Sequence, residues 1–191
     1  MKIFMVLLSL VIATGSGFAQ AKDSAELVKR LDVYMQYNRD KDFEKVLDYT
    51  YPKLFDLASR DQLKQVLESV FKSEAITVTM DSLRIVKIYP IFTIGTGRYA
   101  KITYYMRVGM TAKGDDGINM EAIAEAMKAQ MGAENVTYDA KTKTVLSRET
   151  VPLVAIIDEL SPTWTFMNAK KDDPMMDKLL KKEVLDKLNS Y

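Results

Sequence analysis

The sequence predicts an α+β protein with an antiparallel sheet, and three observations lead to this fold class. Residues 23–71 show the periodicity of amphipathic helices, and strand-like alternation dominates from residue 76 onward. Residues 98–110 alternate without interruption, and the chain ends in one more amphipathic helix. Because helices and strands occur in blocks, the strands are expected to join through hairpins and not through parallel crossovers.

The long alternating stretch, residues 98–110, is the expected centre of the sheet. One side carries Ala100, Ile102, Tyr104, Met106, Val108 and Met110, and the other carries Tyr99, Lys101, Thr103, Tyr105 and Arg107. Side chains alternate across a strand, so we expect one buried face and one face in water. A strand of this length greatly exceeds the usual five or six residues, and it should bend or twist.

Capping residues place three helices before the sheet. Asp23 is the expected cap of the first helix and Asp40 that of the second, which Pro52 ends. Residues 59–62 form a capping box for the third helix. Its expected core stripe is Leu63, Val66, Leu67, Val70 and Phe71. A phase slip at Asp81–Ser82 then predicts a bulge in the first strand.

The second half contains an insertion, residues 113–149, and a C-terminal helix. The insertion is expected to form a helix at 119–131, ended by Gly132, and a hairpin with arms at 135–139 and 144–148. Strands at 151–157 and 163–167 should follow, then one helix from Asp173–Pro174. The methionine-rich inserted helix either docks on the sheet or caps an open end, where it would be less stable than the three N-terminal helices.

Composition excludes several function classes. The chain has 27 Lys plus Arg, 26 Asp plus Glu, and neither histidine nor cysteine. The charges balance and no basic block stands out, so nothing favours a nucleic acid as partner. Without histidine or cysteine there is no Ser-His-Asp or Cys-His nucleophile and no usual zinc site, and we expect neither a metal nor a cofactor.

The first 19 residues are interpreted as a cleaved secretory signal. Lys2 precedes an apolar run at 3–13, and small residues lead to Ala19. The run is shorter than the roughly 20 residues of a membrane anchor, so we expect no stable membrane span after cleavage. No cysteine follows the site, which excludes a lipoprotein. The expected product is one domain, residues 20–191, in a secreted or periplasmic location.

Two motifs have ordinary explanations. Residues 95–100 match the G-x-G-x-x-A pattern of dinucleotide loops, but a strand follows where a helix is needed, so a turn is favoured. Asp115, Asp116, Asn119 and Glu121 could supply oxygen ligands for calcium, but their spacing does not match a calcium loop. A solvated turn and a helix cap explain them better.

The overall pattern resembles the nuclear transport factor 2-like superfamily. The resemblance rests on the N-terminal helices, the Tyr49-Thr50-Tyr51-Pro52 break, the capped third helix and the long strands that end in Trp-x-Phe. It covers residues 25–110 and 151–168. It implies a strongly curved antiparallel sheet that wraps the helices as a cone around an apolar pocket. The expected ligand-binding residues are Tyr34, Tyr51, Phe55, Ile102, Tyr104, Met106 and Trp164.

Three functional hypotheses follow. The first is a non-enzymatic secreted or periplasmic protein that binds a small apolar ligand or an envelope protein. The alternative is a cofactor-free isomerase or lyase that pairs a carboxylate, Asp48, Asp61 or Asp158, with Tyr34 or Tyr104, as isomerases of the resembled family do. The third hypothesis is that the interior is filled and the protein only presents a surface. Asp158 is also a candidate for cross-strand ion pairs with Arg84 and Arg107.

Overall fold

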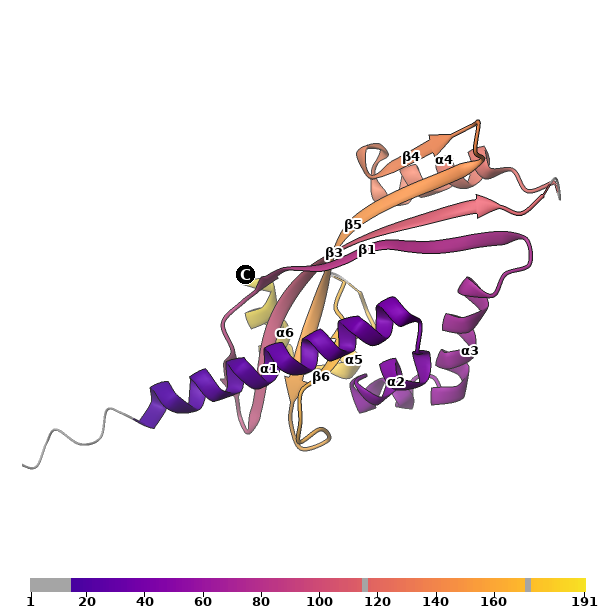
Figure 1. The fold of residues 1–191 in the computed structure, drawn as a ribbon. Coiled ribbons are helices and arrows are strands. Elements are labelled where there is room, and N and C mark those ends of the chain that lie inside the picture. The colour runs from indigo at the N-terminus through magenta and orange to yellow at the C-terminus, as the bar shows by residue number, and fades with distance from the viewer. Residues whose placement is uncertain (1–14, 115–116, 171–172) are drawn as a thin grey trace, which may run out of the picture.

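The computed structural model describes residues 15–114, 117–170 and 173–191, which form a mixed α+β fold (Figure 1). The helices are α1 (Gly15–Asp40), α2 (Phe43–Asp48), α3 (Arg60–Phe71), α4 (Met120–Met131), α5 (Met176–Leu179) and α6 (Lys182–Asn189), with 3-10 turns η1 (Pro52–Asp56) and η2 (Ala133–Asn135). The strands are β1 (Ile76–Ile88), β2 (Phe92–Ile94), β3 (Gly97–Ala112), β4 (Val136–Asp139), β5 (Thr144–Ile157) and β6 (Thr165–Asn168).

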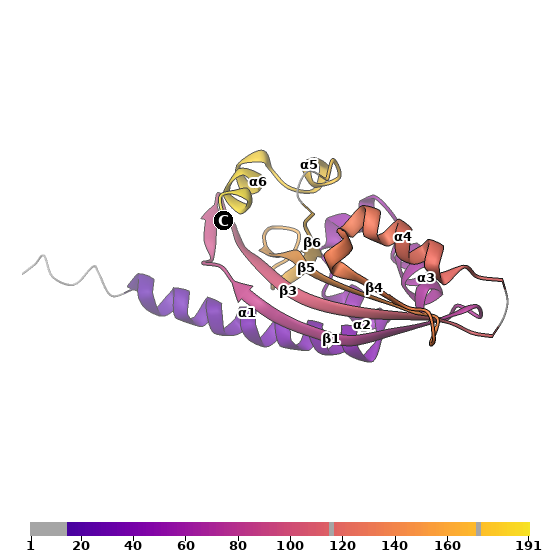
Figure 2. The same cartoon turned by 90° about the horizontal axis from the view of Figure 1, so that it is seen from above.

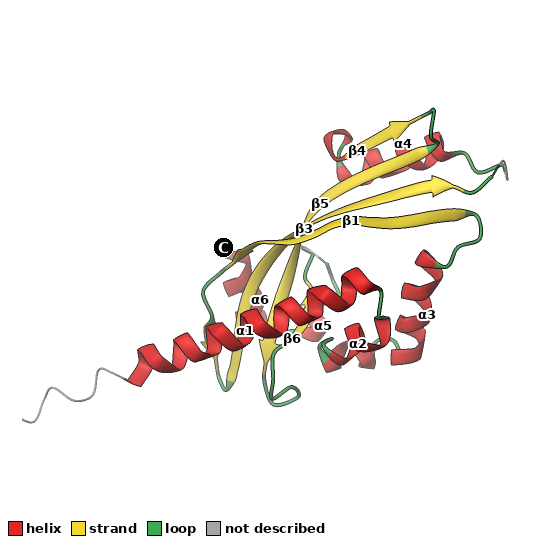
Figure 3. Ribbon diagram, viewed as in Figure 1, coloured by secondary structure: helices red, strands yellow, loops and turns green. Residues whose placement is uncertain are grey.

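All six strands belong to one antiparallel, curled sheet, so the predicted fold class is confirmed. Its main order is β1-β3-β5-β4, with β2 paired to β3 and β6 paired to β5. Strands β1, β3 and β5 run from the body of the molecule into an arm that carries β4 and α4 (Figure 3). The short strand β2 was not predicted.

Strand β5 corrects the prediction of two separate segments at 144–148 and 151–157. It is a single strand of 14 residues that pairs with β3 along its whole length. Pro152 does not interrupt the pairing of β5 on the side away from β3, because β4 pairs there with residues 144–147 and β6 with residues 153–156. The proline therefore lies where no second neighbouring strand needs its missing N–H.

The predicted bulge in β1 is confirmed. The pairing of β1 with β3 shifts register between Met80 and Ser82, and again between Ile85 and Lys87. Each shift inserts one extra residue and increases the local twist of the strand. The second shift was not predicted, since the alternation there is obscured by Val86 and Lys87.

Two predicted helix starts are wrong. Helix α1 already includes residues 15–22, and Asp23 lies within it, where its carboxylate pairs with Arg98 instead of capping. Asp42, and not Asp40, caps α2: its Oδ1 accepts a hydrogen bond of 3.2 Å from the backbone N–H of Lys45. Lys41 between the helices has a φ of 58°, a turn that starts α2 two residues later than predicted.

Three clusters of buried side chains lie on this sheet. The first core packs α1 against the inner face of the sheet: Leu27, Leu31, Met35, Ala100, Ile102, Tyr104, Leu153, Ala155, Ile157, Trp164 and Phe166. The second core lies between the outer face and the C-terminal helices: Tyr51, Tyr99, Val154, Ile156, Met167, Met176, Leu179, Leu180, Val184 and Leu188. The third core packs α4 on the arm: Met120, Ala124, Val136 and Val145.

The second core corrects the prediction of a face in water along residues 98–110. Tyr99 lies on that face and is only 6% exposed, beside Val154 and Ile156 of β5. Figure 2 shows why: α1 covers one side of the sheet, and α5 and α6 cover the other. Only the part of β3 beyond the C-terminal helices exposes its outer face, as at Arg107.

The C-terminal helix is divided in two, which also differs from the prediction. Leu180 adopts an extended conformation, with φ −122° and ψ 151°, and it separates α5 from α6. The apolar residues still reach the sheet, because Met176, Leu179, Val184 and Leu188 are all buried. The break lets two short helices follow the curved outer face more closely than one straight helix would.

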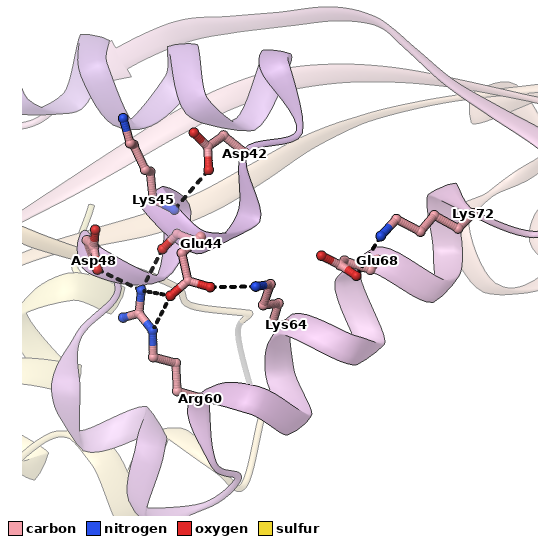
Figure 4. Close-up of polar contacts among 8 residues, drawn as sticks. All are labelled: Asp42, Glu44, Lys45, Asp48, Arg60, Lys64, Glu68 and Lys72. Atoms are coloured by element: carbon pink, nitrogen blue, oxygen red, sulfur yellow. Dashed lines mark hydrogen bonds and ion pairs between the residues drawn. The ribbon is translucent and has the colours of Figure 1, made fainter.

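Helix α3 begins with the predicted capping box, in which Ser59 and Gln62 bond reciprocally. Its predicted core stripe is wrong, since no residue of α3 is buried and Val66 is 61% exposed. Ion pairs hold its first half to α2 instead. Arg60 contacts Glu44 at 2.9 Å and Asp48 at 2.6 Å, and Lys64 contacts Glu44 at 2.7 Å (Figure 4).

The inserted helix docks on the sheet. Asn119 caps α4 by accepting the N–H of Ala122 at 2.9 Å, and Gly132 ends it as predicted. Asp115 and Asp116 lie outside the described residues, as does most of the predicted signal segment, residues 1–14. Within the described part of the chain, no helix is both long and apolar enough to cross a membrane.

Candidate ligand cavity beside the C-terminal helices

A cavity of about 840 Å³ lies between the outer face of the sheet and the C-terminal segment. Strands β3 and β5 form its floor, and residues 169–170 and 173–174 form its walls together with α5 and α6. Cavities of roughly 300–1,000 Å³ are typical of sites for small molecules. The cavity is therefore the strongest candidate for a binding site in the part of the chain that the structure describes.

Its lining combines an apolar surface with a charged rim. The apolar lining includes Pro152, Val154, Ala169, Met176, Leu180, Leu185 and Leu188. The charged lining includes Lys101, Lys170, Lys182, Asp173, Asp177 and Asp186. Three positive and three negative groups balance, so the cavity as a whole favours neither a strong anion nor a strong cation. It suits a ligand with an apolar body and polar or charged ends.

Two lysines tie the walls of the cavity to the rest of the molecule. Lys101 on β3 donates a hydrogen bond of 3.2 Å to the backbone oxygen of Leu188, near the end of α6. Lys53 on η1 donates one of 3.1 Å to the oxygen of Leu179, at the end of α5. Backbone oxygens in the last turn of a helix lack partners within it, and a cation there is favourable. These contacts hold both helices against the sheet.

None of the seven residues predicted to bind a ligand lines this cavity. Five of them meet on the opposite, inner face. Ile102, Tyr104 and Trp164 are buried in the first core, with Tyr34 and Met106 partly buried against it. Tyr34 stacks on Phe166 with ring centroids 4.9 Å apart. The inner face thus brings these residues together as packed side chains, and their binding role stays a prediction.

The other two predicted residues lie elsewhere. Tyr51 belongs to the second core, and its hydroxyl donates a hydrogen bond of 2.6 Å to Asp158 Oδ2. Phe55 is half-buried in η1 and belongs to none of the three cores. The predicted pairing of Asp158 with arginines is wrong: Arg84 stacks on Tyr105, and Arg107 contacts Asp81 at 3.5 Å.

The tyrosines of the first core are held in their neutral form. Burial raises the pKa of Tyr34 from 10.0 to about 12. Burial also raises the pKa of Tyr104, whose hydroxyl hydrogen-bonds to Asn168 Oδ1 at 3.1 Å. The partner of Tyr104 is thus an amide and not the carboxylate that the isomerase hypothesis requires. The buried Trp164 Nε1 has no hydrogen-bond partner among the described residues.

Sequence reasoning missed the cavity because it assigned the outer face to solvent. One signal was present: Tyr99, Val154 and Ile156 are apolar positions on the face that was expected to be wet. Together with the apolar stripe of the C-terminal helix, they indicate that this helix contacts the outer face of the sheet. The described residues contain no group of three or more acidic side chains arranged to hold a metal ion.

Comparison with known proteins adds no relative. No family model matches the chain, and no curated protein matches it.

Proposed function

We propose that this chain is a non-enzymatic binding protein that holds a small, largely apolar ligand in the cavity between the sheet and the C-terminal helices. The observation that carries the proposal is the cavity itself, about 840 Å³ with an apolar floor and a charged rim. Its walls are anchored by the lysine contacts to Leu179 and Leu188, which supports a preformed site. Preformed cavities bind more tightly because less ordering is needed on binding.

The lining indicates the class of ligand. Side chains such as Val154, Leu185 and Leu188 favour an aliphatic or aromatic body, since burial of apolar surface drives its transfer from water. The three lysines and three aspartates of the lining provide partners for polar or charged ends of either sign. Small molecules with an apolar body and polar or charged ends are therefore the ligands that we propose first.

The location and the family are parts of the same proposal. The apolar run at residues 3–13 and the small residues before Gln20 support export to a secreted or periplasmic location. An extracytoplasmic carrier of small amphipathic molecules would use such a cavity. The nuclear transport factor 2-like resemblance is kept as a proposal supported by the helix order and the curled antiparallel sheet.

The isomerase or lyase alternative has one observation in its favour, the contact between Tyr51 and Asp158. However, Asp158 Oδ1 also accepts the backbone N–H groups of Leu160 at 3.0 Å and Ser161 at 3.1 Å. Both oxygens are thus engaged in holding the β5–β6 loop, and Tyr51 is only 2% exposed. A structural role accounts for this pair better than acid–base chemistry does.

Binding of anilinonaphthalene sulfonate, a fluorescent amphipathic anion, tests the proposal. The Ala169→Phe variant places an aromatic ring in the cavity and should strongly weaken binding. Ala129→Phe makes the same change on the exposed side of α4 and should leave binding unchanged. Equal affinities of the two variants and the natural chain would contradict the proposed site.

A further inference from the structure

The outer face of the sheet carries a second charged site, beside β4 of the arm. Arg84 on β1, Arg107 on β3 and Arg148 on β5 lie on this face in adjoining rows of the sheet. The register places Arg84 opposite Tyr105, and Arg107 opposite both Ser82 and Arg148. These arginines are far apart in the sequence, so no basic block reveals them.

The direct opposition of Arg107 and Arg148 is unfavourable unless a negative charge lies between them. Cross-strand partners in an antiparallel pair have Cβ atoms only about 4.5–5.5 Å apart, and like charges at this spacing repel. Arg107 has one acidic contact, Asp81, at 3.5 Å. Within the described ranges, the side chain of Arg148 has no hydrogen bond, ion pair or ring contact. One positive charge of the pair is therefore left without an acidic contact.

The two arginines line a common depression of about 130 Å³. Its other walls include Tyr105, Thr137 and Leu146, which lie on the same face. The exposed hydroxyl of Thr137 and the arginine forks are hydrogen-bond donors, and Arg84 adds a third cation behind Tyr105, 4.8 Å from its ring centre. Arginine forks match the geometry of phosphate and carboxylate oxygens.

We propose that the depression between Arg107 and Arg148 binds a phosphate group, either free or carried by a lipid headgroup. The depression is small, which fits a single tetrahedral oxyanion and not an extended ligand. Several donors can surround such an anion. Its negative charge would then offset the repulsion between the two guanidinium groups. The site shares no lining residue with the cavity at the C-terminal helices, so this inference stands independently of the proposed function.

Titration with inorganic phosphate, followed by amide resonances or calorimetry, tests the site. The natural chain should bind saturably, with shifts centred on Tyr105, Arg107 and Arg148. Arg148→Gln should weaken binding about ten- to a hundredfold, the range for loss of a charge-assisted hydrogen bond. Lys141→Gln removes the same charge at the exposed turn of the β4–β5 hairpin and should bind like the natural chain.

Thermal unfolding provides a second, independent measurement. Without phosphate at low salt, Arg148→Gln should melt at a higher temperature than the natural chain, because it removes the repulsion from Arg107. Added phosphate should raise the melting temperature of the natural chain and of Lys141→Gln, and have little effect on Arg148→Gln. If sodium chloride at equal ionic strength reproduces the shifts, or if all three proteins bind phosphate equally, the site is refuted.

Sedimentation with vesicles distinguishes the two sources of phosphate. Vesicles of phosphatidic acid in phosphatidylcholine should retain the protein in an Arg148-dependent manner if the ligand is a lipid headgroup. Saturable binding of inorganic phosphate with no retention by these vesicles assigns the site to a soluble phosphate. Retention that is identical for the natural chain and Arg148→Gln, without saturable phosphate binding, overturns the proposal.

Discussion

At the scale of single residues, the inner face of the sheet combines apolar packing with phenol groups that cannot ionise easily. Ile102 is fully buried between neighbours of the first core, and Tyr34 stacks on Phe166 in the same cluster. A buried phenolate would lose its hydration, so the folded protein favours the neutral phenol. Stability at alkaline pH depends directly on this preference.

The first prediction concerns that pH dependence. The pKa of Tyr34 is about 12 in the folded protein and 10.0 in its ordinary state, so the unfolded chain releases this proton first. The free energy of unfolding should be insensitive to this group below pH 10 and fall as pH rises from 10 toward 12. Urea unfolding at about pH 9 and about pH 11 measures the fall, and Tyr34→Phe should reduce it. An unchanged fall in the variant would show that Tyr34 is not responsible.

The second prediction concerns packing around Ile102. Ile102→Ala should lower the free energy of unfolding by about 2–5 kcal/mol, because it removes buried methylene groups and leaves a cavity. Thr150→Ala, at an exposed position of the neighbouring strand, should change it by no more than about 0.5 kcal/mol. Chemical denaturation of both variants decides the point. Similar losses at the two positions would mean that the inner face is misassigned.

At the scale of elements, the sequence predicted the features that contacts between neighbouring residues determine. The capping box at Ser59, the Asn119 cap and the uninterrupted alternation of β3 all follow from neighbouring residues, and the structure contains them. The exposure of α3 and the break between α5 and α6 depend on surfaces distant in sequence. An apolar stripe shows that a helix can bury one face, but not whether the fold provides a surface to cover it.

The exposure of α3 leads to the third prediction, which reverses the order of stability expected from the sequence. Helix α3 buries no residue, whereas α4 buries Met120 and Ala124. Amides in residues 63–70 should therefore exchange with solvent faster than those in residues 123–127, since local opening is easier where little apolar surface is buried. Hydrogen exchange followed by mass spectrometry or NMR gives both rates. Faster exchange in α4 would restore the idea of a loosely held lid.

The fourth prediction compares two alanines on opposite sides of α4. Ala124 is 0% exposed on the buried side of α4. Ala124→Leu should therefore overpack the third core and lower the free energy of unfolding by about 1–3 kcal/mol. Ala126 is exposed, and Ala126→Leu should be close to neutral because both residues favour helices. The pair is matched in chemistry and helix position, and thermal unfolding compares them. Equal tolerance of leucine at both sites would place α4 away from the sheet.

At the scale of the whole molecule, three separate cores share one set of strands. The candidate cavity and the arginine pair both arise from this arrangement, since each joins residues that are distant in sequence. Lys101 and Leu188 meet at the cavity, and Arg107 and Arg148 meet across two strands. Sequence patterns predicted the strands but not the partners of their outer face, because long-range packing against the C-terminal helices decides which outward positions are covered.

The last prediction concerns independent opening of the arm. Val145 and Leu153 are both fully buried on β5, but Val145 belongs to the third core and Leu153 to the first. Val145→Ala should cost about 2 kcal/mol, from about 0.8 kcal/mol per buried methylene and the cavity left behind. Because the main contacts of α4 and β4 are with each other, with η2 and with β5, this loss should accelerate amide exchange there and leave α1 protected.

Leu153→Ala is the matched control on the same strand. It damages the core that joins α1 to the sheet, so exchange should rise in α1 and in the arm together as global unfolding becomes easier. Native-state hydrogen exchange of both variants, at residues 27–35 and 120–131, separates the two responses. If Val145→Ala accelerates exchange in α1 as strongly as in α4, the arm and the body unfold as one cooperative unit, because the long strands then transmit the loss of packing along their whole length.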